Sequence, residues 1–108
     1  YFTKTTFSCM NADGFPAAIG GLGRRQAVLV GMEAHICVLQ TAMDLAATGA
    51  EVFVVEDAIC SRRLENYQNA LDRMRASGIN IVSAESVVFE WMGDSRHPQF
   101  KTIQGWLR

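Results

Sequence analysis

Short apolar runs alternate along the chain with segments in which apolar positions recur at helical spacing. Residues 26–30, 51–55 and 79–82 form such runs, each of strand length and flanked by residues that favour turns. Strands that alternate with helical segments are typical of βαβ units. The pattern therefore predicts an α/β fold with a parallel sheet. Residues 1–4 are predicted to be the end of a further strand.

Helical periodicity covers most of the remaining chain. Residues 35–48 are apolar on more than one face, which predicts a largely buried helix with Gly49 as its C-terminal cap. Residues 64–77 predict a covering helix that is closed by Gly78. Residues 11–23 are rich in Gly, Pro and Ala, so we expect a loop there with a short helical turn near residues 16–20.

Two further helices are predicted in the last quarter of the chain. Ser83 is a good N-cap for a helix that runs through Met92, with Glu85 in its first turn. Pro98 suits the first position of a final helix. Apolar residues crowd this region, and we expect them to be docking contacts: Phe89, Trp91, Phe100, Ile103, Trp106 and Leu107.

Composition and charge limit the class of protein and the partners that the chain can have. The chain has 108 residues, is 49% hydrophobic and has a formal net charge of −1, which fits one globular domain over residues 1–108. The near-neutral charge gives no reason to expect nucleic acid as a partner. No apolar stretch reaches the ~18 residues of a membrane span. We expect neither a membrane nor a nucleic-acid partner, but a small-molecule substrate.

Three cysteines occur without metal-binding spacing, so no metal site and no cofactor are predicted. An odd, unpaired set favours a reduced compartment, the cytoplasm, with mitochondria left open. Cys37 differs from the other two because it follows an apolar strand and a short loop at the start of a helix. A helix N-terminus stabilises a thiolate, which makes Cys37 a candidate nucleophile, whereas Cys9 and Cys60 are predicted to be structural.

Several segments together resemble the isochorismatase-like cysteine hydrolases, in particular the isochorismatase-domain-containing subgroup. Residues 31–42 (GMEAHICVLQTA) resemble the nucleophile motif, and residues 4–8 (KTTFS) resemble the segment that carries the catalytic lysine. Residues 54–58 and 89–103 are similar to later parts of the domain. The resemblance implies a Rossmann-like, three-layer αβα fold around a parallel sheet. It also implies that this chain is the C-terminal portion of a larger domain, with the N-terminal strands missing.

The resemblance further implies a Cys-Asp-Lys triad. Cys37 would be the nucleophile and Lys4 the cation that holds its thiolate. No aspartate of this chain matches the family motif, and we expect the catalytic aspartate upstream of Tyr1. A cis peptide between Met32 and Glu33 is implied, with the backbone N–H groups of Glu33 and Cys37 as an oxyanion hole. Two side chains near these motifs, those of Phe7 and His35, are candidate pocket residues.

Two functions from different classes follow. The first is hydrolysis of a small amide, or a related C–N or ether-linked substrate, through a covalent intermediate on Cys37. The alternative is a non-catalytic family member that serves as a structural or protein-interaction subunit. An apolar strand ending in Asp upstream of Tyr1 would favour the enzyme. In either case the aromatic final residues favour a homo-oligomer.

Overall fold

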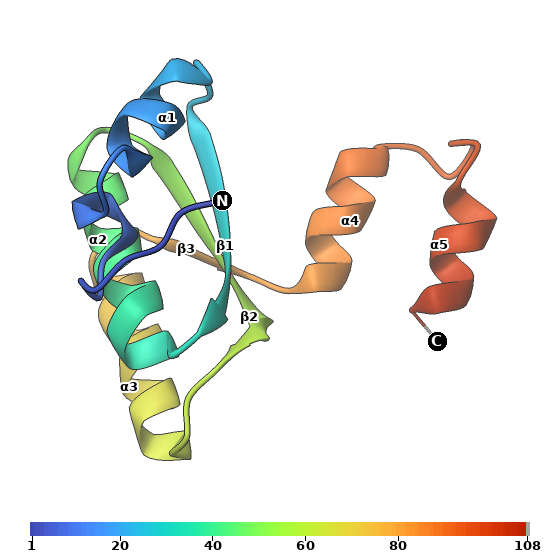
Figure 1. The fold of residues 1–108 in the computed structure, drawn as a ribbon. Coiled ribbons are helices and arrows are strands. Elements are labelled where there is room, and N and C mark those ends of the chain that lie inside the picture. Colours follow the sequence, from blue (N-terminus) through green and yellow to red (C-terminus); the bar gives the residue numbers. More distant parts are fainter. Residues whose placement is uncertain (108) are drawn as a thin grey trace.

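The computed structural model describes residues 1–107 and contains three parallel strands in the spatial order β1-β2-β3. The strands are β1 (Gln26–Met32), β2 (Glu51–Cys60) and β3 (Asn80–Val82). Helices α2 (Leu39–Ala47) and α3 (Leu64–Ala76) cover one face of the sheet, and α4 (Ala84–Met92) lies on the other face (Figure 1). The predicted α/β class, the parallel sheet and the layered arrangement are thereby confirmed.

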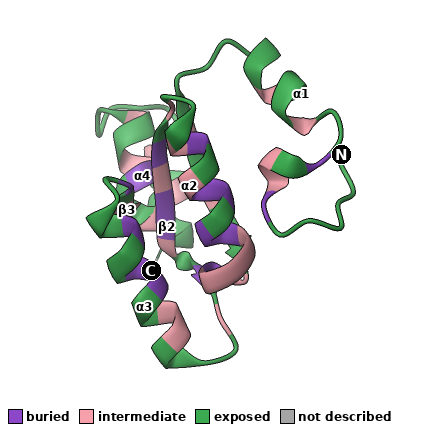
Figure 2. Cartoon of the chain, turned by 90° about the vertical axis from the view of Figure 1, so that its left-hand side faces the viewer, coloured by how far each residue is buried: buried purple, intermediate pink, exposed green. Residues whose placement is uncertain are grey.

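The core lies between the sheet and helices α2 and α3. Val52 and Val54 alternate along β2 toward these helices, which present Leu45 and Met74 to the same interior. Figure 2 shows buried residues following β2 and the inner sides of α2 and α3. Burial of these apolar side chains is the main force that holds the layers together.

Strand β1 lies at an edge of the described sheet and pairs with β2 alone. Its alternate residues Val30 and Met32 remain 61% and 70% exposed. Residues 1–4 were predicted to end a further strand, and this prediction is wrong for the described structure. They are exposed and have no hydrogen-bonded strand partner, which a β-strand requires.

The pairing of β1 with β2 changes register near the carboxyl ends of the two strands. Leu29 pairs with Val54, but Gly31 pairs with Ile59, so β2 contains extra residues at this break in register. Gly31 has a φ of +115°, a conformation that only glycine adopts readily. Because β1 pairs with β2 again beyond this break, β2 continues to Cys60, past its predicted end at residue 55. Its last residue, Cys60, lies opposite Met32.

The predicted helix over residues 35–48 is built in two parts. It begins as a π-helical turn, η2 (Ala34–Val38), and continues as α2. The carbonyl of Glu33 accepts a hydrogen bond from the Val38 N–H, five residues on, which gives the turn its width, and a second from the Ile36 N–H. The closing glycine after α2 was predicted correctly, because Gly49 has a φ of +91°.

The remaining helices follow the sequence pattern closely. A short 3₁₀ turn, η1 (Cys9–Asn11), precedes α1 (Phe15–Gly21), where a helical turn was expected. The Ser83 hydroxyl accepts a hydrogen bond from the Ser86 N–H, so Ser83 is the N-cap of α4 as predicted. No helix within residues 1–107 is long and apolar enough to cross a lipid bilayer.

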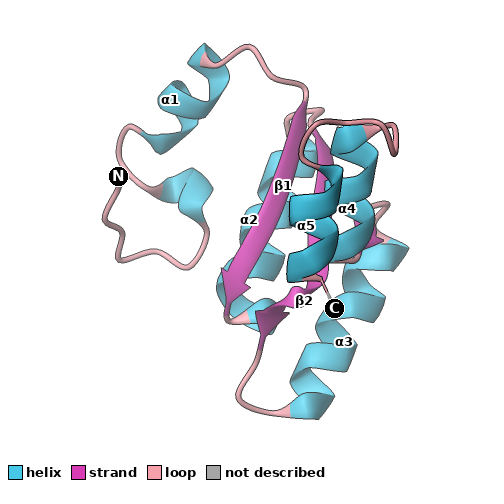
Figure 3. Cartoon of the chain, turned by 90° about the vertical axis from the view of Figure 1, so that its right-hand side faces the viewer, coloured by secondary structure: helices cyan, strands magenta, loops and turns pink. Residues whose placement is uncertain are grey.

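The last helix, α5 (Phe100–Trp106), begins two residues after the predicted start at Pro98. His97, Pro98 and Gln99 form a turn instead, because the Gln99 N–H donates to His97 Nδ1 and the Phe100 N–H donates to the His97 carbonyl. Helices α4 and α5 lie side by side in front of the sheet in Figure 3. Phe89 and Phe100 join them in an edge-to-face contact with ring centroids 6.0 Å apart.

Candidate active site

Cys37 lies in the π-helical turn that follows the carboxyl end of β1. This placement arises from the chain's order of strand, loop and helix, which is common where parallel sheets carry functional residues. The peptide bond between Met32 and Glu33 in the intervening loop is cis. Cys37 itself is half-buried, so its thiol is accessible at the end of the sheet.

Lys4 reaches Cys37 across 33 positions of sequence. The Lys4 Nζ atom lies 3.6 Å from Cys37 Sγ and donates a hydrogen bond to the Thr6 carbonyl at 2.8 Å. The contact places the Lys4 ammonium group directly beside the sulfur of the candidate nucleophile. The two residues that the sequence motifs single out are thus in contact.

The segment that carries Lys4 is anchored to the helix that follows Cys37. The Cys9 N–H donates to the buried Thr41 Oγ1 on α2 at 2.9 Å. The buried Ser8 accepts a hydrogen bond from the Met10 N–H and begins the η1 turn. These contacts give Ser8 and Cys9 a structural role, because they hold the lysine segment beside α2.

A small cavity of about 160 Å³ opens between this segment and β1. Its walls are mostly apolar, with the Cys37 thiol and the Lys4 ammonium as its reactive groups. The lining residues are Lys4, Cys9, Leu29, Val30, Met32, Cys37, Val38 and Thr41. Neither Phe7 nor His35, the candidate pocket residues, is in this lining, and the Phe7 side chain is largely exposed. Cys9 lines the cavity, which its loop position in the sequence did not indicate.

His35 and Glu33 instead contact the loop that follows β2. His35 Nδ1 lies 2.8 Å from Ser61 Oγ, and Glu33 Oε1 lies 2.9 Å from Arg62 Nε. Both side chains therefore face the loop after β2 and each other, with His35 Nδ1 3.5 Å from Glu33 Oε2, and neither lines the cavity at Cys37. Sequence reasoning missed Ser61 and Arg62, because neither belongs to a motif with an obvious chemical role.

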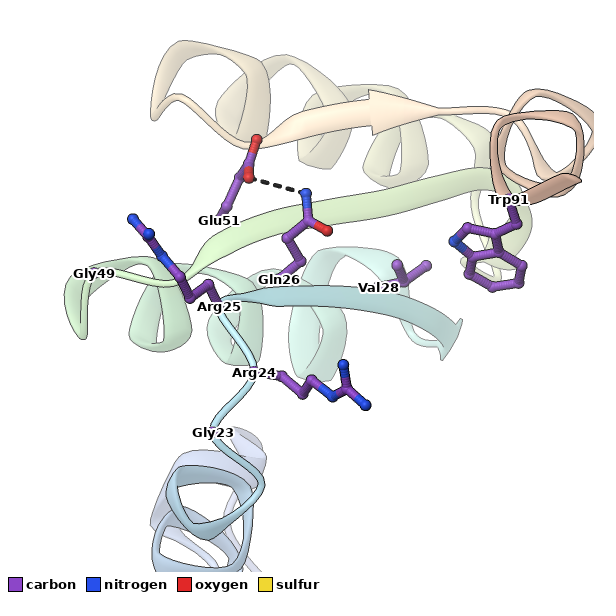
Figure 4. Close-up of a pocket in the computed structure, with 8 residues that line it drawn as sticks. All are labelled: Gly23, Arg24, Arg25, Gln26, Val28, Gly49, Glu51 and Trp91. Carbon is purple, nitrogen blue, oxygen red and sulfur yellow. Dashed lines mark hydrogen bonds between the residues drawn. The ribbon is translucent and has the colours of Figure 1, made fainter. Parts of the chain in front are cut away.

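A larger hollow of about 800 Å³ lies at the opposite, amino-terminal ends of β1 and β2 (Figure 4). Gln26 and Glu51 are hydrogen-bonded across the two strands there, with Gln26 Nε2 3.1 Å from Glu51 Oε2. Arg24 and Arg25 border it, but its lining residues include no cysteine, serine or threonine. We therefore place the candidate active site in the smaller cavity at Cys37.

Metal chemistry has no evident site in the described part of the chain. Within residues 1–107, no group of three His, Cys, Asp or Glu side chains is arranged to hold a metal ion.

Fold and site together define an α/β protein with a thiol–ammonium pair at the carboxyl end of a parallel sheet. Residues 1–86 match the model of the isochorismatase domain family. The chain is also 41% identical over 107 residues to isochorismatase domain-containing protein 1 of Salmo salar, a match that covers 99% of this chain. The chain belongs to the isochorismatase family.

Solved structures support the same assignment. A MAR1 ribonuclease from Caenorhabditis elegans is 37% identical, with a TM-score of 0.81 over 94% of this chain. The nicotinamidase of Bacillus subtilis is 25% identical, with a TM-score of 0.71 over 77% of this chain. The chain spans 38% of the length of the salmon relative, 52% of the worm structure and 46% of the nicotinamidase.

Proposed function

We propose that this chain carries the nucleophile of a cysteine hydrolase that cleaves a small amide or a related substrate. The observation that supports this most directly is the 3.6 Å contact between Lys4 Nζ and Cys37 Sγ at the wall of a cavity. A thiolate held beside an ammonium group is a competent nucleophile near neutral pH. Membership of the isochorismatase family agrees with this chemistry.

In the proposed reaction, Cys37 Sγ forms a bond to the carbonyl carbon of the substrate. The C–N bond then breaks, and the amine leaves with the proton that the thiol gave up. Water hydrolyses the resulting thioester, which releases the acid and restores the thiol. The backbone N–H groups of Glu33 and Cys37 are the proposed donors to the oxyanion. The proton carrier is assigned, by family resemblance, to an aspartate upstream of Tyr1.

The substrate class is proposed from the cavity and from one relative. The cavity is small and mainly apolar, with a single cation, which suits a compact uncharged or anionic molecule. The similarity to a protein named nicotinamidase supports an amide as the cleaved group.

RNA is the second candidate substrate, because structural relatives at 30–37% identity are named ribonucleases. The net charge of −1 does not favour it, since phosphate backbones are bound by basic surfaces.

Turnover by the full-length protein tests the proposal, with a panel of small amides and a short RNA as substrates. Cys37→Ala should reduce amide hydrolysis by about 10³-fold or more, because the nucleophile is lost. Cys60→Ala, which alters an exposed cysteine, serves as the matched control and should leave turnover unchanged.

Equal turnover by the wild type and the Cys37→Ala variant would eliminate Cys37 as the nucleophile. Cleavage of RNA alone would replace the amide proposal with the second candidate. A wild-type protein that turns over none of these substrates would favour the non-catalytic subunit.

A further inference from the structure

Two loops meet beside the nucleophile at the carboxyl edge of the sheet. One follows β1 and contains Glu33 and His35, and the other follows β2 and contains Ser61 and Arg62. Because β1 and β2 are parallel and paired up to Met32 opposite Cys60, both loops leave the sheet side by side.

Arg62 holds the Glu33 carboxylate through an ion pair and a hydrogen bond. Arg62 Nε lies 2.9 Å from Glu33 Oε1, and the Arg62 backbone N–H donates to Glu33 Oε2 at 3.3 Å. The Glu33 side chain is only 21% exposed, although that of Arg62 is 80% exposed. The carboxylate is therefore fixed against the second loop by both the side chain and the backbone of one residue.

Ser61 makes an equivalent contact with His35. Ser61 Oγ lies 2.8 Å from His35 Nδ1 and accepts a hydrogen bond from the His35 backbone N–H at 3.4 Å. On the other side of the ring, His35 Nε2 lies 3.5 Å from Asn66 Nδ2 on α3. The first residues of the η2 turn are thus tied to the loop after β2.

Glu33 links these contacts to Cys37. Its backbone carbonyl accepts the hydrogen bonds from Ile36 and Val38 that shape the turn on either side of Cys37. Its side chain is held by Arg62 at the same time. A shift of Glu33 would therefore shift the turn that presents Cys37 Sγ to Lys4.

We propose that Arg62 and Ser61 are positioning residues, which act through Glu33 and His35 to hold the turn that carries Cys37. The inference rests on the proposed function, since it assigns these residues to the same nucleophile. Neither residue lines the cavity at Cys37, so their effect on the reaction is indirect. Small displacements of reacting groups are sufficient to slow catalysis strongly.

The test compares two neighbouring arginines in the full-length protein. Arg62→Gln removes the side-chain ion pair with Glu33 and keeps the backbone hydrogen bond, whereas Arg63→Gln removes an exposed ion pair with Glu65 and is the matched control. Two quantities are measured: the rate of Cys37 alkylation by iodoacetamide relative to Cys60, and kcat and KM with an amide substrate. Mass spectrometry of the labelled peptides separates the cysteines.

Arg62→Gln should slow Cys37 alkylation and lower kcat about tenfold with KM unchanged, because the thiol is misplaced while the cavity walls remain. Arg63→Gln should leave both quantities at their wild-type values. A Glu33→Gln background should abolish most of the Arg62→Gln effect, since coupled residues are not additive. Ser61→Ala should lower the Cys37 alkylation rate and kcat in the same way. Ser61→Thr, which keeps the hydroxyl, should have wild-type values of both.

Identical behaviour of the Arg62→Gln and Arg63→Gln variants would overturn the positioning role. The alkylation rates need no turnover, so they report on the loop even if Cys37→Ala shows that the proposed hydrolase activity is wrong. Additive effects of Glu33→Gln and Arg62→Gln would show that Arg62 does not act through Glu33, and would also overturn the proposal.

Discussion

At the scale of single residues, the contact between Lys4 and Cys37 dominates the chemistry of this chain. Sequence motifs identified both side chains, and the fold brings Nζ to 3.6 Å from Sγ. The other two cysteines have no such partner among the hydrogen bonds of residues 1–107, although Cys9 lines the same cavity. Cys37 should therefore be the most reactive of the three thiols.

We predict that brief iodoacetamide treatment at pH 7 labels Cys37 faster than Cys9 and Cys60, because the thiolate fraction controls the rate. Lys4→Met should slow Cys37 labelling about fivefold, the effect of roughly 1 kcal/mol between charges about 4 Å apart in water. Lys101→Met, on an exposed position of α5, is the control and should have no effect. Preferential labelling of Cys9 or Cys60 would contradict the activated thiol.

At the scale of elements, α3 is joined to the irregular part of β2 through Tyr67. Its hydroxyl donates a hydrogen bond to the Glu56 carbonyl, which lies where the register between β1 and β2 breaks. Burial raises the pKa of Tyr67, and the negative charges of Glu56 and Asp57 raise it further. The neutral phenol is thus the form that the folded state favours.

We predict that Tyr67→Phe lowers the free energy of unfolding at pH 7 by about 1 kcal/mol, the net value of a hydrogen bond. Because the pKa of Tyr67 is raised on folding, this contribution is fully present below the unfolded value near 10 and is lost as the pH rises through the folded value. Urea unfolding of the wild type and of Tyr67→Phe, below and above pH 10, measures this difference in the free energy of unfolding. Tyr1→Phe, at an exposed position, is the control, and equal stability of Tyr67→Phe and the wild type at pH 7 would refute the prediction.

At the scale of the whole molecule, large apolar side chains remain uncovered. Trp91 on α4 and Trp106 on α5 are 73% and 77% exposed, and the open face of β1 adds Val30 and Met32. Exposed apolar surfaces of this kind are typical of contact regions.

We predict that the full-length protein forms a homo-oligomer, measured by light scattering at micromolar concentration. Truncation before Pro98 removes α5 with Trp106 and should weaken the assembly. Lys101→Ala, a substitution of a polar residue on the same helix, should leave it intact. A monomer at this concentration would refute the prediction.

The sequence by itself determined the elements whose signals are local. Helix α3 follows from its apolar spacing and the glycine after it, and the start of α4 follows from Ser83, because propensity and capping act within a few residues. The order of strands and helices was enough to predict a parallel sheet. Two sequence motifs were enough to identify Lys4 and Cys37 as candidate catalytic residues.

Only the tertiary structure decided the features that depend on partners distant in the sequence. Residues 1–4 have strand-like composition but no strand to pair with among the described residues, and β2 extends to Cys60 because β1 pairs with it again beyond the break in register. The contacts of Arg62 with Glu33 and of Cys9 with Thr41 likewise join separate segments. Such contacts leave no periodic trace in a sequence, since they form only after the layers have packed.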